Sequence, residues 1–345
     1  MIAEALANAA ELTGTAFQKL EVAGPGFLNF TLAPGWFAGV VESVLEEKEN
    51  YGRTDFGGGK RMLVEFVSAN PTGPMHMGNA RGGALGDGIA SVLDWAGYRV
   101  DREFYVNDAG NQINKFGLSL DLRYQQLYKD GIEMPEDSYH GQDIIDHAKN
   151  FAAIYGDKYM NVSEEERRKA LVAYALPLNI EGLERDLAKY RIHYDRWFRE
   201  SALHADGSVM KVVELLKEKG HTYEAEGATW FKATEFGADK DFVLVRSNGV
   251  PTYVVPDIAY HYGKLVTRGY DKAIDVLGAD HHGYVPRLKA ALQALGVDPD
   301  RLDVVLMQMV RLIRDGEVVK ASKRSGKAIT LVTLLDEVPI DAARF

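Results

Sequence analysis

The clearest pattern in the chain is an alternation of short apolar runs and amphipathic segments between residues 61 and 106. The run MLVEFV over 62–67 has strand length and is mostly apolar, as buried strands of parallel sheets are. A Pro- and Gly-rich loop follows, then apolar positions at helical spacing from Ala80 to Ala96, then the strand-like run VDREFYV over 100–106. Such a strand–helix–strand unit predicts an α/β fold with a parallel sheet.

The same alternation returns in the last third of the chain. Residues 273–277 and 303–309 predict strands, Val285–Leu295 predicts a helix between them, and Asp315-Gly316 predicts the turn of a hairpin. The charge-rich segment of about 114–230 is mostly helical in pattern. We interpret it as one large central insertion into a single α/β domain over 56–335.

Both ends of the chain differ from this centre. Residues 1–50 predict a helix, two short strands around Gly24-Pro25-Gly26 and a second helix, so we expect a small separate domain over 1–55. Residues 336–345 predict the opening of a helix that belongs to a further domain. The first helix has no lead-in and the last has no cap, so we expect a chain that is cut at both ends.

Composition narrows the possible chemistry. The 345 residues contain no cysteine, which excludes disulfides, thiolate nucleophiles and cysteine-bound zinc, and the adjacent His281 and His282 give little support for a metal site. Neither a signal peptide nor an apolar run of membrane-spanning length is apparent, so we expect a cytoplasmic protein without membrane contact. The formal net charge of −10 requires any RNA contact to come from local basic patches or from parts outside this chain.

The loop after the first predicted strand carries candidate phosphate-binding groups. A loop that enters a helix presents backbone N–H groups, and both these groups and the helix dipole favour an anion. His76 and Asn79 lie three residues apart across this entry, and Gly78 leaves room for a base or a ribose. Taken alone, the tetrapeptide HMGN more often marks an ordinary turn before a helix.

A second candidate is the basic segment VVKASKRSGKAITL, which follows the last predicted strand and contains Lys320 and Lys323. Lysines that close on a triphosphate stabilise the negative charge that accumulates during phosphoryl transfer. Considered alone, KASK is more often a solvated basic loop.

Together and in this order, the two segments resemble the signature motifs of class I aminoacyl-tRNA synthetases. SANPTGPMHMGNARGGALGD resembles the HIGH region, above all that of the arginine-specific branch, which VEFVSAN and EFYVNDAGNQI also match. KASK resembles the KMSK loop, with Ala321 in place of methionine. Asn79 stands where the HIGH motif ends in histidine, and asparagine can donate a hydrogen bond but cannot carry a positive charge. The resemblance implies catalytic roles for His76, Asn79, Lys320 and Lys323.

The stretch PTYVVPDIAYH suggests how a guanidinium could be recognised. Tyr253 precedes Asp257 by four residues at the start of a predicted helix, so we expect both to face one pocket. A guanidinium requires planar carboxylate recognition, reinforced by an aromatic hydroxyl or ring. The stretch resembles the motif that holds the substrate side chain in the arginine-specific family, although a helix cap with a packed tyrosine would look the same.

The resemblance implies further site residues. It implies an ATP site made of His76, Gly78, Asn79, Gly278, Asp280, Met309, Val310, Lys320 and Lys323. It implies an arginine site made of Ser68, Asn70, Glu200, Tyr253, Asp257 and His281, with no metal ligands. Considered alone, Glu200 also fits a solvated surface charge, and His281 fits ordinary hydrogen bonding.

The function implied is that of an arginine–tRNA ligase with a Rossmann-like catalytic domain and a partial α/β N-terminal domain. Its expected partners are L-arginine, ATP with Mg²⁺, and tRNA(Arg); we expect a monomer without structural zinc. Charging of tRNA is expected to be weak, because the family's anticodon-reading domain lies beyond this chain. Two alternatives stay open: a nucleotidylyltransferase with a HIGH-type motif, and a non-catalytic synthetase-like binding module.

Overall fold

The structure is a computed structural model that describes residues 2–311, 313–314, 317–318 and 329–345. These residues form two compact units, one that ends at Asp55 and one over Phe56–Phe345. The limit between the units falls where the sequence predicts the end of a first domain. Each unit is described by itself.

The first unit contains two helices and a hairpin. Helix α1 (Ile2–Ala9) precedes strands β1 (Phe17–Ala23) and β2 (Phe27–Leu32), which pair antiparallel, and α2 (Pro34–Glu47) follows. Pro34 stands at the first turn of α2, where its missing N–H costs no helical hydrogen bond.

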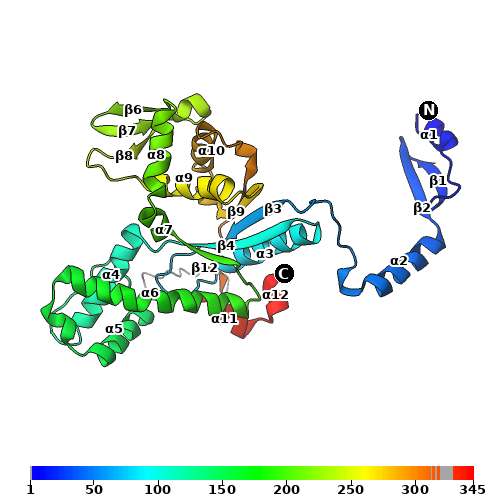
Figure 1. Ribbon diagram of the computed structural model, residues 1–345. Coiled ribbons are helices and arrows are strands. Elements are labelled where there is room, and N and C mark those ends of the chain that lie inside the picture. The colour runs from blue at the N-terminus through cyan, green and yellow to red at the C-terminus, as the bar shows by residue number, and fades with distance from the viewer. Residues whose placement is uncertain (1, 312, 315–316, 319–328) are drawn as a thin grey trace. The chain divides into compact units, whose positions relative to one another are not determined.

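A five-stranded parallel sheet forms the centre of the second unit (Figure 1). Its strands are β3 (Arg61–Phe66), β4 (Arg99–Val106), β5 (Arg196–Arg199), β9 (Lys272–Gly278) and β10 (Leu302–Met307). Their order is β10-β9-β3-β4-β5, so the chain winds outward from β3 in both directions. The predicted parallel α/β class is confirmed. In such doubly wound sheets, ligands bind beyond the carboxyl ends of the strands where the winding reverses, here between β3 and β9.

Helix α3 (Asn79–Trp95) connects β3 to β4 and lies close to the sheet because its inner face is made of small residues. Gly82, Gly83 and Gly86 are buried on that face. A side chain on Gly86 would overlap the ring of Phe66, which is fully buried in β3. This close approach fixes the start of α3, and with it His76 and Asn79, at the carboxyl end of β3.

The segment of about 114–230 is more complex than the predicted insertion. Helices α4 (Gly110–Gln125), α5 (Gln142–Tyr155) and α6 (Glu164–Lys189) pack together, as the helical pattern predicts. The chain then returns to the sheet as β5, which pairs with β4. The prediction of one continuous insertion was therefore wrong. A four-residue edge strand with arginine at both ends does not stand out in a charged sequence.

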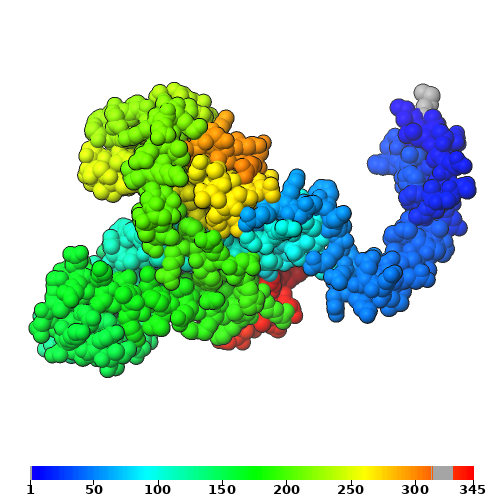
Figure 2. Space-filling view, viewed as in Figure 1, coloured from blue at the N-terminus to red at the C-terminus, as the bar shows by residue number. Residues whose placement is uncertain are grey.

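After β5 the chain leaves the sheet again. Helices α7 (Glu200–Ala205) and α8 (Ser208–Glu218) lead to a small antiparallel sheet of β6 (Thr222–Ala225), β7 (Ala228–Phe231) and β8 (Phe242–Val245). In the space-filling view, this small sheet and the helices α4 to α6 form separate protrusions of the second unit (Figure 2). Helix α9 (Val254–Tyr262) brings the chain back beside the main sheet, and α10 (Val285–Ala294) lies between β9 and β10 in the chain and packs on α9.

The last elements also belong to the second unit. Strands β11 (Ile313–Arg314) and β12 (Glu317–Val318) form the predicted hairpin, whose turn residues lie outside the described part. Helices α11 (Leu331–Glu337) and α12 (Ile340–Arg344) follow. The sequence pattern assigns 336–345 to a further domain, whereas here Ala343 accepts a hydrogen bond from Tyr190 through its carbonyl at 2.9 Å. Within the described residues, no helix combines the length and apolar character needed to cross a bilayer.

Candidate functional site

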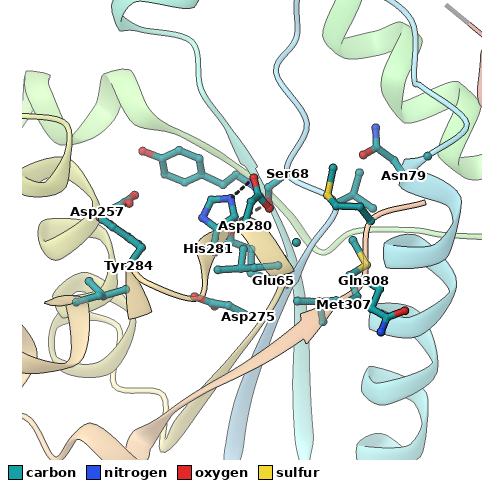
Figure 3. A pocket seen from close by; sticks show the side chains of 18 of the residues that line it. Glu65, Ser68, Asn79, Asp257, Asp275, Asp280, His281, Tyr284, Met307 and Gln308 are labelled. Atoms are coloured by element: carbon teal, nitrogen blue, oxygen red, sulfur yellow. Dashed lines mark hydrogen bonds and ion pairs between the residues drawn. The ribbon is translucent and has the colours of Figure 1, made fainter. Parts of the chain in front are cut away.

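A cavity of about 430 Å³ lies at the carboxyl ends of the central strands, where the winding reverses. Figure 3 shows Asp257 and Tyr284 on one side of this cavity, Asn79, Met307 and Gln308 on the other, and Glu65 and Asp275 between them. Of the residues predicted for the site, the cavity brings together Ser68, His76, Gly78, Asn79, Asp257, Gly278, Asp280, His281, Met309 and Val310.

The start of α3 forms one end of the cavity. Gly78 donates its backbone N–H to His76 Nδ1 at 3.0 Å, so Nδ1 accepts and Nε2 is the ring nitrogen that carries hydrogen in the neutral imidazole. Asn79 is the first residue of α3, and its Nδ2 lies 3.3 Å from Met75 Sδ. The backbone N–H groups of residues 77–80 already donate within the protein, so the donors that this end can offer an anion are the His76 imidazole and the Asn79 amide.

The segment that follows the predicted lysine loop is attached to this end. Met77 donates its backbone N–H to Ile329 O at 2.9 Å, and Leu331 donates to Met75 O at 2.8 Å. Lys320 and Lys323 themselves lie outside the described residues. The two signature segments of the sequence are thus joined by backbone hydrogen bonds at the point where the second one ends.

The opposite wall of the same end comes from the loops after β9 and β10. Gly278, Asp280, Met309 and Val310, which the sequence resemblance assigns to an ATP site, line it. A side chain at Gly278 would overlap the Asp280 carboxylate and lie 3.7 Å from Met309 Sδ. The absence of a side chain therefore keeps this wall open for a flat group to approach the backbone.

Two carboxylates, each held by a tyrosine hydroxyl, mark the other end of the site. Tyr284 donates to Asp257 Oδ2 at 2.6 Å, and Tyr105 donates to Glu200 Oε2 at 2.9 Å. Burial and the nearby charge of Asp257 raise the pKa of Glu200, against the hydrogen bond from Tyr105. Burial and Asp257 likewise raise the pKa of Tyr284 well above its usual value, so its hydroxyl stays a donor.

Glu200 is held at the start of α7 by Asp108. The side chain of Asp108 is 4% exposed, and its oxygens accept from Ser201 N at 2.8 Å and Ser201 Oγ at 2.7 Å. A carboxylate that accepts from the first N–H groups of a helix stabilises the helix start. The segment EFYVNDAGNQI thus supplies both Tyr105, the donor to Glu200, and Asp108, which fixes its backbone.

Ser68 forms the part of the cavity next to β3 through an unusual backbone. Val67 and Ser68 have φ angles of 68° and 42°, a left-handed backbone conformation that residues other than glycine rarely adopt. Ser68 Oγ donates to Glu65 Oε1 at 2.8 Å and accepts from Tyr105 N at 3.0 Å. The strained turn is therefore tied to both neighbouring strands.

Three predicted arginine-site residues do not line the cavity. Asn70 is exposed in the loop after β3, and Glu200 reaches the cavity wall only through Tyr105. Tyr253 is 75% exposed, because it precedes the first turn of α9, and its ring centroid lies 6.5 Å from that of Tyr284. The tyrosine that contacts Asp257 is thus Tyr284 and not Tyr253.

Several residues that line the cavity were not predicted from the sequence: Glu65, Tyr105, Tyr260, His261, Asp275 and Tyr284. The sequence contained a recognisable signal for two of these residues, Glu65 and Asp275. Glu65 and Asp275 are acidic residues inside apolar strand runs, MLVEFV and AIDVL, where an unpaired charge would be costly.

Comparisons with known proteins agree with this geometry. The family model described as tRNA synthetases class I (R), catalytic domain, matches residues 40–344, and the arginyl tRNA synthetase N terminal domain matches residues 1–32. The arginine–tRNA ligase of Caldanaerobacter subterraneus subsp. tengcongensis is 60% identical over the whole chain, and that of Acetivibrio thermocellus is 56% identical. In both cases the chain spans 61% of the relative's length.

Solved structures show the same fold. A crystal structure from Campylobacter jejuni, described provisionally as an arginyl-tRNA synthetase, is 36% identical with a TM-score of 0.82, over 91% of this chain and 68% of that one. The Thermus thermophilus arginyl-tRNA synthetase has a TM-score of 0.71 at 23% identity, over 99% of this chain and 64% of that one. These findings do not favour the nucleotidylyltransferase and the binding-module alternatives.

Proposed function

Because the chain belongs to the arginine-specific family of class I aminoacyl-tRNA synthetases, we propose that it activates L-arginine with ATP and transfers it to the 3′ end of tRNA(Arg). In the first step the arginine carboxylate attacks the α-phosphorus of ATP, which is bound as its Mg²⁺ complex, and pyrophosphate leaves. In the second, a terminal ribose hydroxyl of the tRNA attacks the adenylate carbonyl, and AMP leaves.

The observation that carries this proposal is the pair of carboxylates Asp257 and Glu200. Each is held by a neutral hydroxyl, and the raised pKa of Glu200 reflects burial beside a second negative charge. A cation bound in the cavity beside Asp257 offsets this repulsion, and Glu200 adds its charge from behind Tyr105, which lines the same cavity. A guanidinium is the side-chain cation whose planar, multiple donors suit two carboxylates at once.

The roles of the remaining residues follow from their positions along the cavity. His76 and Asn79 donate to the phosphates, Gly78 and Gly278 admit the nucleoside, and Asp280, Met309 and Val310 line its wall. Ser68 and Asn70 hold the backbone end of arginine, with His281 nearby. Lys320 and Lys323 stabilise the charge that develops on the transferring phosphoryl group.

Two further parts of the proposal concern location and assembly. The protein acts in the cytoplasm, where tRNA is charged for translation. It acts as a monomer without structural zinc. Sedimentation of the purified chain tests the second statement.

Calorimetric binding of a non-hydrolysable arginyl-adenylate analogue tests the function without tRNA. We expect tight binding of the arginyl analogue and weak binding of the lysyl and glutamyl analogues. Asp257→Asn should lower the affinity by at least about 2 kcal/mol, because one guanidinium partner loses its charge. Asp130→Asn makes the same change on an exposed loop and serves as the matched control. Equal binding of all analogues would contradict the proposal.

A further inference from the structure

A fully buried lysine lies directly beneath the arginine end of the cavity. Lys264 is 0% exposed, and its Nζ donates to Glu65 Oε2 at 2.6 Å and to Asp275 Oδ1 at 2.8 Å. Glu65 belongs to β3 and Asp275 to β9, the two strands between which the winding reverses. One ammonium group therefore joins the two strands at the floor of the cavity.

His261 completes this cluster. Its Nε2 lies 2.6 Å from Asp275 Oδ2, and its Nδ1 lies 2.7 Å from the backbone carbonyl of Asp257. A carbonyl can only accept, and an ionised carboxylate can only accept. The two ring nitrogens thus join Asp275 of β9 to the backbone of Asp257 in α9. Lys264 Nζ lies 3.4 Å from the same Nε2, so the lysine, the histidine and the two carboxylates form one network of contacts.

The cluster acts in opposite directions on its two carboxylates: burial raises the pKa of Glu65 despite the attraction of Lys264, whereas the pKa of Asp275 is lowered. Although burial acts in the opposite direction, Lys264 and His261 hold the pKa of Asp275 well below its usual range. Against its own burial, Lys264 has a raised pKa because of Asp275 and Glu65. The cluster also explains why three potential metal ligands, Glu65, His261 and Asp275, gather here: the lysine ammonium already lies within hydrogen-bonding distance of both carboxylates.

The position of Lys264 follows from the local helix geometry. Asp257, His261 and Lys264 stand at i, i+4 and i+7, on one face of α9 and its continuation. That continuation, Gly263–Thr267, is a π-helical turn in which Arg268 donates its backbone N–H to Gly263 O at 2.8 Å. Such wide turns are frequent at functional sites.

The contacts of the cluster reach both ends of the proposed arginine position. Through Glu65 Oε1 the cluster holds the hydroxyl of Ser68, whose backbone is strained. Through His261 it holds the backbone of Asp257. We propose that Lys264 is a positioning residue for arginine: it does not line the cavity, but it fixes the distance between the Ser68 and Asp257 subsites. This inference rests on the proposed function.

The chain offers a matched control one turn farther along. Arg268 donates to Glu103 Oε1 at 2.9 Å, and Glu103 is 0% exposed in β4. This pair also joins the π-helical turn to a buried strand carboxylate, but neither residue lines the cavity. Glu103 also accepts from the hydroxyl of Tyr260, which lines the cavity, at 2.7 Å, and the amide oxygen of Glu103→Gln can keep this bond. The control therefore perturbs the same helix without removing a contact of Ser68 or Asp257.

The test compares two double variants of the 345-residue chain, because Lys264→Met alone leaves a buried carboxylate without its partner and could prevent folding. In Lys264→Met/Glu65→Gln one carboxylate charge is removed with the lysine, and the amide oxygen introduced in place of Glu65 can still accept from Ser68. Arg268→Met/Glu103→Gln is the control. We expect the first variant to bind the arginyl-adenylate analogue about ten- to a hundredfold more weakly, with the affinity for ATP unchanged.

Each result has a separate meaning. Binding of the analogue by Lys264→Met/Glu65→Gln at wild-type affinity overturns the positioning role and leaves the proposed function intact. An equal loss in Arg268→Met/Glu103→Gln, or an equal loss of ATP and arginine affinity, makes the lysine merely structural and also overturns it. If the unmodified chain binds no arginyl analogue, the proposed function falls and the inference with it.

Discussion

Two glycines of α3 permit a quantitative test of how the start of this helix is held at the cavity. Gly86 faces β3 and Gly88 faces open space, although both are helical and only two residues apart. A Cβ at Gly86 would lie 2.6 Å from Phe66 Cδ2 and closer still to the Cβ and Cγ atoms of that residue. A Cβ at Gly88 meets nothing within 4 Å.

The sign and size of the two effects follow from these contacts. Replacing a helical glycine by alanine gains about 1 kcal/mol, and this gain is the same at both positions. At Gly86 the helix must also move away from Phe66, and overpacking of this kind costs about 1–3 kcal/mol. We therefore expect Gly88→Ala to stabilise the second unit, and Gly86→Ala to be less stable than Gly88→Ala by about 1–3 kcal/mol.

Urea unfolding of both variants, followed by circular dichroism, measures this difference, and binding of an ATP analogue measures its consequence for the site. Gly86→Ala should weaken ATP binding because the start of α3 positions His76 and Asn79, whereas Gly88→Ala should leave it unchanged. Equal stability of the two variants would refute the packing of α3 on β3 described above.

Three further predictions concern the arginine end. Tyr284→Phe should weaken binding of the arginyl analogue by about 1.5–3 kcal/mol in calorimetry, because a hydrogen bond to a charged group is lost. Tyr253→Phe should have a smaller effect. The reverse order of the two effects would assign the Asp257 contact to Tyr253. Arginine affinity should fall as the pH is lowered through the raised pKa of Glu200, because the protonated carboxyl loses its attraction for the guanidinium, and Glu200→Gln should lack this dependence when the titration is repeated. Asp108→Ala should cost the start of α7 about 1 kcal/mol and lower arginine affinity while ATP affinity, measured in parallel, stays constant.

The sequence predicts the centre of the fold because buried parallel strands are mostly apolar runs, and β3, β9 and β10 are of this kind. Strand β4 contains three consecutive charged residues and is recognised by its apolar end, EFYV, and by its place after a helix. It does not predict β5. The strand RWFR is short, only half-buried and bounded by arginines, one of which lies 3.8 Å from Glu103 through its Nε. Its place in the sheet depends on a charge partner that is distant in the chain.

The site residues also fall into those that the sequence predicts and those that it does not. His76, Gly78 and Asn79 are recognisable because the loop, the helix start and the side chains are contiguous. Tyr284 is not, because it contacts Asp257 from 27 positions away and replaces the tyrosine that helical spacing favours. Lys264 looks like a solvated charge in the sequence, yet its partner Glu65 is 199 positions away.

The four carboxylates around the arginine end differ in what holds them, and this difference separates recognition from support. Glu65 and Asp275 are buried, and both accept from the ammonium group of Lys264, with His261 at 2.6 Å from Asp275, so these two carboxylates already have a cationic partner within the fold. Asp257 and Glu200 are held by tyrosine hydroxyls, with the half-exposed His204 at 3.6 Å from Glu200. A neutral donor orients a carboxylate without cancelling its charge, and the charge is then available to a ligand. Among the described residues at this site, the negative charge that remains lies where a guanidinium would bind.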